Sequence, residues 1–529
     1  MNSRQITYNY QFIPDISIYR ISQIKDKKEQ VAKDVIAGKY GRVDTKPSRR
    51  ELLAKAGYDY ETIQSIVKKM MAGTYKSAYN KTYCNFPVKK VLQSMSFTLS
   101  INDITGSFSL TLFPEYEGIS VFDAVHIMDI VEIREPCIDG STNTVQSRPA
   151  FIGIVKSRKF VTQTDGNGGM RRVSISGIAA TGLVSQFLIN LDTSAMALTG
   201  QLKEQANLNN ELTMSFGGEK NLKVSELVKK VWEHFLNISQ QNGTPEIARY
   251  IEGTLGSVSE MFDIDDSTFY YPVGCIFKGE QTQDFFSLID GIVPSPVYEK
   301  FAYMGLDGKM KIKIRQVPFD PDKWKNKATR QQVETKLLKS FEISQSDKEV
   351  YTVFYAYLNG YPIDEQKSLR LSTLEEKVDD TLIASDEYKI YGYKPLICHF
   401  IGYGLKDGEQ DSDSPSNMKT VTENLKKWFG NLHKMFSGSM TFAMTYQNTA
   451  VIMPGDVLCF LPSAKNPYGE HWAEFYVEGI THNWNYGTGG EISLTVSRGG
   501  AYKNGEFLED ETAKMEVGKL SVLMESIQK

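Results

Sequence analysis

Apolar and polar residues alternate along several stretches of this chain, and such a two-residue period predicts β-strands that bury one face. The longest example runs from Phe475 to Gly500, where two alternating segments flank a glycine-rich turn at Gly487 to Gly490. In the second segment Ile, Leu and Val alternate with Glu, Ser and Thr. The pattern therefore predicts a β-hairpin with one apolar face.

The same alternation predicts a hairpin in residues 94–112 and another in residues 301–315, the latter with a Gly-x-Asp-Gly turn. One or two strands, broken at Pro14 and Asp15, are expected in residues 6–24, and further strands in residues 438–442 and 453–458. The second strand of the 301–315 hairpin carries a row of basic residues: Lys309, Lys311, Lys313 and Arg315. We interpret this row as a solvent face that protects a strand edge from unwanted pairing, not as a nucleic-acid site.

A helical period replaces the strand period between residues 26 and 72. Apolar residues there recur at the spacing of three short helices, with Gly38 to Gly41 closing the first helix. Longer helices are predicted around residues 224–238 and 421–435, and a short one from about 283. The uncharged residues 173–191 contain six Ser, Thr, Gln and Asn side chains, so we expect a strand and a packed helix, not a membrane span.

Composition narrows the possible functions. The chain has 529 residues, enough for three or four domains, with 60 basic and 64 acidic residues, so no overall basic field indicates nucleic-acid binding. Five cysteines lie far apart, and none has the spacing of a zinc site. We therefore expect free thiols in a reducing cytoplasm, no secretory signal, no metal and no cofactor.

Catalytic motifs are also missing from the sequence. It contains no His-Glu-x-x-His, Gly-x-Ser-x-Gly or P-loop motif, which argues against the commonest hydrolase and nucleotide-binding chemistry. His471 and His482 could approach each other across the terminal hairpin, but a structural role is the more economical interpretation. The acidic residues between Asp407 and Asp413 lack the order of a calcium loop and predict a solvated loop. We expect that the chain is not an enzyme.

Several segments resemble, in order, the hub proteins of phage tails and related contractile injection machines. The terminal hairpin ends its strands on Tyr-Val-Glu-Gly-Ile-Thr-His and Ser-Arg-Gly, as the last hairpin of that family does. Six motifs earlier in the chain also resemble segments of that family. They are Ser-Phe-Ser-Leu-Thr at 107–111, Met-Asp-Ile-Val-Glu-Ile at 128–133, Phe-Ile-Gly-Ile-Val at 151–155, Arg-x-x-Pro-Phe-Asp at 315–320, Tyr-Gly-x-x-Pro-Leu at 391–396 and Pro-Gly-Asp at 454–456.

The resemblance implies a mainly β fold with α/β parts, that is, an α+β chain with two related β-barrel hub domains. Residues 1–25 and 76–195 would form the first barrel domain, and residues 346–505 the second. Residues 196–345 would form an α/β middle domain with a linker, residues 26–75 an inserted three-helix module, and residues 506–529 a helical C-terminal tail.

The resemblance further implies a homotrimer whose six barrels form a pseudo-sixfold ring in the virion tail or baseplate, assembled in the cytoplasm of a bacterial host. Its expected partners are the tail tube or tube-initiator protein above, the central spike or tail-tip protein below, baseplate wedge proteins and the tape measure protein. DNA would meet the ring only in transit. The alternatives are a tail-associated peptidoglycan hydrolase or a cell-wall-binding protein, either of them targeted by the 26–75 module.

That module resembles the short cell-wall-binding repeats found at the C-terminal end of some phage lysozymes. Its Val-Ile-Ala-Gly-Lys-Tyr-Gly and Ala-Gly-Tyr-Asp-Tyr segments match the repeat, and the resemblance makes Tyr40, Arg50 and Tyr58 candidate muropeptide-binding residues. The sequence departs from the pattern at Tyr40, where the repeat has Trp, and at Lys68, where it has Asn. The alternative is that the three residues only cap and pack a three-helix knob.

Overall fold

A computed structural model describes most of the chain. The described residues are 13–23, 27–36, 38–41, 46–71, 79–101, 103–138, 144–165, 168–186, 188–190, 213–215, 222–229, 231–232, 251, 253–265, 270–271, 276–278, 282–290, 293–333, 338–358, 385–400, 414–444, 452–460 and 473–513. The acidic segment 407–413, His471 and the tail beyond residue 513 lie outside these ranges.

Thirteen of the described strands form one sheet, in which the order β2-β1-β7-β8-β9-β4-β3-β25-β26-β23-β20 is extended by β24 and β19 beside β25. The part formed by N-terminal strands is called the first half-sheet here. Its strands are β1 (Asp15–Gln23), β2 (Tyr79–Tyr83), β3 (Leu92–Ser100), β4 (Asp103–Leu112), β7 (Ile130–Ile138), β8 (Val145–Asp165) and β9 (Gly168–Ala179).

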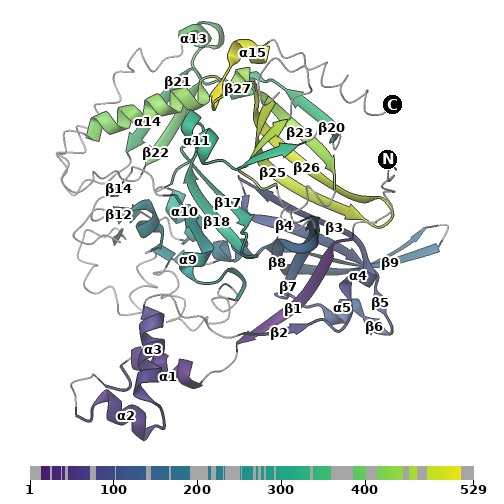
Figure 1. Cartoon of the computed structure of the whole chain (residues 1–529), viewed down its shortest axis with the longest axis vertical. Coiled ribbons are helices and arrows are strands. Elements are labelled where there is room, and N and C mark those ends of the chain that lie inside the picture. The colour runs from purple at the N-terminus through teal and green to yellow at the C-terminus, as the bar shows by residue number, and fades with distance from the viewer. Residues whose placement is uncertain are drawn as a thin grey trace, which may run out of the picture.

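The second half-sheet comes from the C-terminal third of the chain and contains the predicted terminal hairpin. Its strands are β19 (Arg330–Val333), β20 (Leu338–Ser344), β23 (Phe436–Ala443), β24 (Val457–Phe460), β25 (Ala473–Asn485) and β26 (Gly489–Gly500). Figure 1 shows the second half-sheet, in green to yellow, above the first half-sheet, in purple to blue.

The two half-sheets meet where β3 pairs antiparallel with β25, a contact that we call the seam. Leu99 pairs with Ile480, Phe97 with His482 and Met95 with Trp484. All six side chains are buried, and Thr98 and Thr481 share a hydrogen bond of 3.0 Å between their hydroxyl oxygens. Backbone pairing and a common core therefore join segments that are almost 400 residues apart in sequence.

A smaller layer packs beside the sheet. Its three-stranded sheet has the order β13 (Phe262–Ile264), β18 (Met310–Gln316) and β17 (Tyr298–Met304), and β17 with β18 forms the predicted 301–315 hairpin. The helix α10 (Phe285–Asp290) begins close to the expected position, and residues 224–229 and 231–232 are helical as predicted. Trp232 packs edge-to-face against Phe262 and Phe285, and the three rings belong to the main apolar core.

Shorter elements complete the described chain. The remaining strands are β5 (Glu115–Tyr116), β6 (Ile119–Ser120), β10 (Leu188–Asn190), β11 (Thr213–Ser215), β12 (Leu222–Lys223), β14 (Tyr270–Tyr271), β15 (Ile276–Lys278), β16 (Thr282–Asp284), β21 (Val353–Leu358), β22 (Pro395–Phe400), β27 (Tyr502–Lys503) and β28 (Glu506–Phe507). The remaining helices outside the inserted module are α4 (Val88–Val91), α5 (Val121–Ala124), η1 (Ala180–Gln186), α9 (Val258–Met261), α11 (Pro321–Asn326), η3 (Asp347–Glu349), α13 (Ser385–Tyr391), α14 (Ser414–Phe429), η7 (Leu432–Lys434) and α15 (Glu509–Ala513).

The inserted module has the three predicted helices, α1 (Lys27–Ile36), α2 (Arg49–Lys55) and α3 (Tyr60–Met71). Figure 1 shows them beyond the ends of β1 and β2, away from the main sheet. Their core is a separate cluster formed by Val31, Ala32, Val35, Leu53, Ile63 and Val67. The module therefore has an apolar core of its own, although it interrupts a pair of neighbouring strands.

The fold class is confirmed, because the described chain is mainly β with α/β parts. The two expected closed β-barrels, in contrast, are not seen among the described strands. Among the described strands no pairing closes either half-sheet on itself, and the seam joins the two halves edge to edge. The stretch after β9 was expected to be a packed helix and is a 3-10 helix, η1, followed by β10.

Candidate functional site

The candidate muropeptide residues lie on one small helical module but differ in their surroundings. Tyr40 and Tyr58 are partly buried and pack, with Tyr60, against the module's apolar core. Arg50 is exposed on the first turn of α2, and its guanidinium carbon lies 5.6 Å from the centre of the Tyr60 ring. The tyrosines thus contribute to packing, whereas Arg50 keeps most of its surface available.

Local hydrogen bonds explain the shape of the module. Ser48 and Glu51 form a reciprocal capping box at the start of α2, which satisfies two backbone N–H groups. Arg49 donates from Nε and Nη2 to the carbonyl oxygen of Gly41, at 3.1 and 2.9 Å, and so fixes the turn that carries Tyr40. Asp59 accepts from the backbone N–H of Thr62 at 2.8 Å and caps α3.

Sequence reasoning missed two residues of this module. Tyr60 provides the aromatic face under Arg50, and the side-chain nitrogen of Gln64 is buried without a hydrogen-bond partner among the described residues. Both residues lie in segments of the sequence that match the cell-wall-binding repeat. No spacing rule relates Arg50 to Tyr60, because their contact depends on how α2 and α3 cross.

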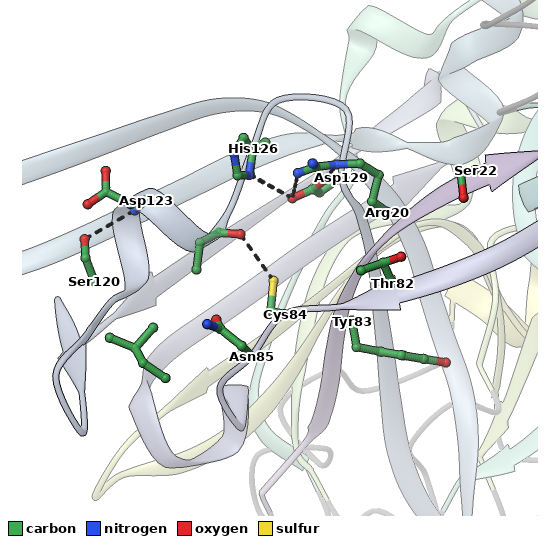
Figure 2. A pocket seen from close by; sticks show the side chains of 12 residues that line it. Arg20, Ser22, Thr82, Tyr83, Cys84, Asn85, Ser120, Asp123, His126 and Asp129 are labelled. Carbon is green, nitrogen blue, oxygen red and sulfur yellow. Dashed lines mark hydrogen bonds and ion pairs between the residues drawn. The ribbon is translucent and has the colours of Figure 1, made fainter.

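A concave site lies where β1 and β2 meet the chain around α5, and we call it the root pocket. Its volume is about 520 Å³. Arg20 and Thr82 are cross-strand partners, so with Ser22 they share one face of the β1–β2 pair. Figure 2 shows these side chains opposite those from the α5 segment. The facing wall is formed by Ile119, Ser120, Asp123, Ala124, His126 and Asp129.

An ion pair holds the two walls of the root pocket together. Arg20 donates from Nε to Asp129 at 2.8 Å and from Nη2 at 3.2 Å, and the backbone N–H of His126 donates to the same carboxylate at 2.8 Å. Asp129 is almost completely buried, so these bonds replace the water that it loses. Burial, with the nearby Asp129, raises the pKa of the Cys84 thiol to about 11, so this cysteine is not an activated nucleophile.

His482 lies at the seam, and its place in the core confirms a structural contact for one of the two histidines considered above. It is 2% exposed, its ring stacks on Phe97, and Nδ1 lies 3.0 Å from Oε1 of the fully buried Glu135. The other nitrogen, Nε2, has no hydrogen-bond partner within the described residues. This pair ties β25 to β7 across the seam.

Three of the sequence motifs converge on one buried cluster, which we call the motif junction. Arg315, of the Arg-x-x-Pro-Phe-Asp motif, pairs with Glu299 and donates from Nη2 to the carbonyl oxygen of Gly455 at 2.8 Å. It also donates to the hydroxyl oxygen of Tyr476 at 3.2 Å. Arg315 and Glu299 are each 6% exposed. The interpretation of Arg315 as part of a solvent-facing row is therefore wrong, since Gly455, just before β24, and Tyr476 of β25 cover it.

The end of the same motif completes the junction. The ring of Phe319 lies 3.3 Å from the guanidinium carbon of Arg498, the arginine of the Ser-Arg-Gly motif. Asp320 accepts from the indole N–H of Trp428 at 2.9 Å. Burial lowers the pKa of Arg498 to about 10, and its Nη1 donates to the carbonyl oxygen of Trp428 at 2.6 Å. The junction joins the middle layer, α14 and the second half-sheet.

The other basic residues of the 309–315 row are neutralised locally. Lys309 pairs with Glu260, Lys311 with Asp307, and Lys313 with Asp263 and Asp265. Each cation therefore has a carboxylate partner within the middle layer. This arrangement leaves no unpaired row of charge for a phosphate backbone, in agreement with the interpretation drawn from the sequence.

The described part of the chain shows neither a metal-binding cluster nor a membrane-spanning helix. No group of three or more His, Cys, Asp or Glu side chains there could hold a metal ion. No described helix is both long enough and apolar enough to cross a membrane. The thiols of Cys84, Cys398 and Cys459 are free.

Comparison with protein families identifies the inserted module. Residues 29–71 match the CW_7 repeat family, which confirms the recognition of a cell-wall-binding repeat at this place in the chain. The match covers α1, α2 and α3 and contains Tyr40, Arg50 and Tyr58. The search of curated proteins found no match to this chain.

Solved structures similar to this chain come from phage tails and a related secretion system. One is the 43 kDa tail protein of prophage MuSo2 from Shewanella oneidensis, with 10% identity and a TM-score of 0.41, covering 80% of this chain and 94% of that one. A tail protein from Neisseria meningitidis MC58 has 10% identity and a TM-score of 0.42, covering 79% and 93%. An Escherichia coli component of the type VI secretion system has 7% identity and a TM-score of 0.31, covering 79% and 75%.

Proposed function

We propose that this chain is the structural hub of a phage tail baseplate or of a phage-like injection particle. The seam carries the proposal, because it places two half-sheets of one chain side by side with continuous backbone pairing. The order of the hub motifs along the sequence supports it, and the motif junction gives three of those motifs a shared structural role.

The proposed mechanism is geometric. Three chains would supply six half-sheets, and a ring of six can match a sixfold tube on one side while the three chains match a threefold spike on the other. Among the described strands, β2 and β20 end the sheet order. Pairing β20 of one chain with β2 of the next would repeat the seam between chains and cover both of these edges, while β19 stays at the end of its own branch beside β24.

In this assembly the ring joins the tail tube or tube-initiator protein to the central spike, contacts baseplate wedge proteins, and lets the tape measure protein and DNA pass. The central channel of such a ring suits this role if it does not bind nucleic acid tightly. The chain's formal charge of −4 and the paired lysines of the middle layer agree with passage without tight binding.

Native mass measurement of the purified full chain tests the proposal. The expected result is three times the chain mass of 59.7 kDa, and co-purification with the tube or spike protein of the same particle. A chain that stays monomeric at micromolar concentration and binds neither protein would contradict it.

A second role is favoured by the CW_7 match, namely binding to the peptidoglycan of the host wall through α1, α2 and α3. We assign Arg50, with Tyr40 and Tyr58, to muropeptide contact, since Arg50 is exposed above the aromatic face of Tyr60. Sedimentation of the full chain with purified cell walls tests binding. A zymogram of the same walls tests the hydrolase alternative, and clearing would favour an enzyme over a hub that only binds.

A further inference from the structure

The root pocket occupies a particular place relative to the inserted module. Its strand wall belongs to β1 and β2, which are the strands immediately before and after the module in the sequence. Ser22 precedes the first residue of α1 by only five positions, and five extended residues span at most about 18 Å. The first residue of the module therefore lies within about 18 Å of Ser22 in the strand wall of the pocket.

Both walls of the pocket carry hydrogen-bonding side chains that are available to a ligand. The hydroxyls of Ser22 and Thr82, the amide of Asn85 and the carboxylate of Asp123 line the cavity and have no side-chain partner among the described residues. These groups include donors and acceptors at fixed positions on two strands and a short helix. Water satisfies them when the pocket is empty, and a ligand rich in hydroxyls and amides can replace that water.

The charged groups that line the root pocket disfavour an anionic ligand. Among the described residues that line the pocket, Arg20 has the only guanidinium, and both oxygens of Asp129 already bind it. Asp123 adds a second carboxylate to the lining, and His126 is the one other group there that could carry positive charge. A phosphate or nucleic-acid backbone would therefore meet no free cation of fixed charge, whereas a neutral polar ligand would meet no repulsion.

We propose that the root pocket binds one unit of a neutral amino sugar in the same glycan strand that the module recognises. This inference rests on the proposed wall-binding role of the module. The volume of about 520 Å³ falls within the range of small-ligand sites. Ile119 and the rim residue Tyr83 offer apolar surface for the C–H face of a sugar ring, and the open polar groups fit its hydroxyls and acetamido group.

Two contacts on one strand have a predictable consequence. Once the module has bound the glycan, the next sugar units are present at the pocket at a high effective concentration. A weak second contact therefore strengthens binding to long strands much more than to short fragments. The pocket thereby acts as a tether at the root of the module, where it also aligns the bound strand with the edge of the first half-sheet.

Fragment binding to the full chain tests the inference directly. The probe is the disaccharide of N-acetylglucosamine and N-acetylmuramic acid with its lactyl carboxyl capped as a simple amide, which keeps it neutral, titrated by calorimetry and by saturation-transfer NMR. We expect two sites per chain. The double variant Asp123→Ala/Asn85→Ala should lose one of them, and Arg50→Ala should lose the other. Asp322→Ala, which removes an equally exposed carboxylate on α11, is the matched control and should keep both.

Intact cell walls provide the second measurement. The double variant should bind walls at least tenfold more weakly than wild type and Asp322→Ala, at unchanged melting temperature. Equal wall binding and equal fragment stoichiometry of the double variant would overturn the pocket assignment. Loss of one site in the double variant, with no effect of Arg50→Ala, would keep the pocket and contradict the module role instead.

Discussion

Arg315 shows how a residue's role can depend on chain segments far away in sequence. On β18 it occupies the same alternating face as three lysines, and this pattern alone predicts solvent exposure. Gly455 and Tyr476, more than 100 residues later, convert the position into a buried cation site. Alternation specifies which face a side chain lies on, but it contains no information about what covers that face.

The pair Arg315–Glu299 makes a sharp prediction about stability. Arg315→Met leaves the Glu299 carboxylate buried without a cation, which we expect to lower the free energy of unfolding by about 3–5 kcal/mol. The double variant Arg315→Met/Glu299→Leu should recover most of that loss. Urea unfolding of the full chain measures both. Lys311→Met, which removes only the partly exposed pair with Asp307, is the control and should cost about 1 kcal/mol or less. Similar losses in Arg315→Met and Lys311→Met would contradict the assignment.

The buried carboxyl group of Asp456 is expected to make the free energy of unfolding depend on pH. Burial raises the pKa of its carboxyl to about 7, from an ordinary value near 3.8, and the side chain accepts from the N–H of Met453 at 3.0 Å and from Gln331 at 3.2 Å. Between those two pH values the folded chain binds a proton that the unfolded chain releases. Its contribution to stability therefore falls as pH rises, by at most about 1.4 kcal/mol per pH unit.

The variant Asp456→Asn isolates this effect, because the amide oxygen can accept the same two hydrogen bonds and does not ionise. We expect melting temperatures close to wild type at pH 4.5 and a variant that becomes increasingly more stable than wild type up to pH 7.5. Calorimetric scans of both proteins across this range measure the difference. A difference that does not change with pH would show that Asp456 titrates normally.

At the scale of elements, the sequence predicted local structure well where one strand face is buried. The alternating segments 94–112, 301–315 and 475–500 became β3 with β4, β17 with β18, and β25 with β26, because a hairpin needs only its own turn and its own apolar face. The three helices of the module followed from their 3.6-residue period in the same way.

The seam could not be predicted from the same pattern. An edge strand presents identical backbone donors and acceptors to any partner, so the alternation of β3 and β25 does not indicate that they pair with each other. Closure of a half-sheet raises the same difficulty, since it depends on strand tilt and on long-range pairing. The root pocket was missed for a related reason, because Thr82 and Asp123 come from elements that share no motif.

Adjacent arginines of the module allow its fold and its binding to be separated. Arg49 holds the Gly41 carbonyl, whereas Arg50 is exposed above Tyr60. Arg50→Ala should abolish sedimentation with cell walls and leave the melting temperature of the module within about 2 °C of wild type, as expected for an exposed substitution. Arg49→Ala should lower that temperature. Differential scanning calorimetry with the sedimentation assay distinguishes the two. Full wall binding by Arg50→Ala would place the muropeptide site elsewhere on the module.

At the scale of the whole molecule, two architectural units are combined with little mutual dependence. The module's apolar cluster is separate from the core that runs through both half-sheets and the middle layer. The strands that flank it stay paired up to Gln23 and Tyr79, so the insertion occupies the position of a hairpin turn. Such a site tolerates an added domain because the flanking backbone remains hydrogen-bonded whatever is inserted.

This arrangement predicts the effect of removing the module. Replacement of residues 24–78 by a short Gly-Asn turn should leave β1 paired with β2, because Gln23 and Tyr79 are already cross-strand neighbours. We expect the shortened chain to retain the main thermal transition and the trimeric mass proposed for the hub, and to lose binding to cell walls. Calorimetry, native mass measurement and wall sedimentation on the same preparation check all three. Loss of the main transition would mean that the first half-sheet depends on the module, and retained wall binding would move the recognition of the wall to another part of the chain.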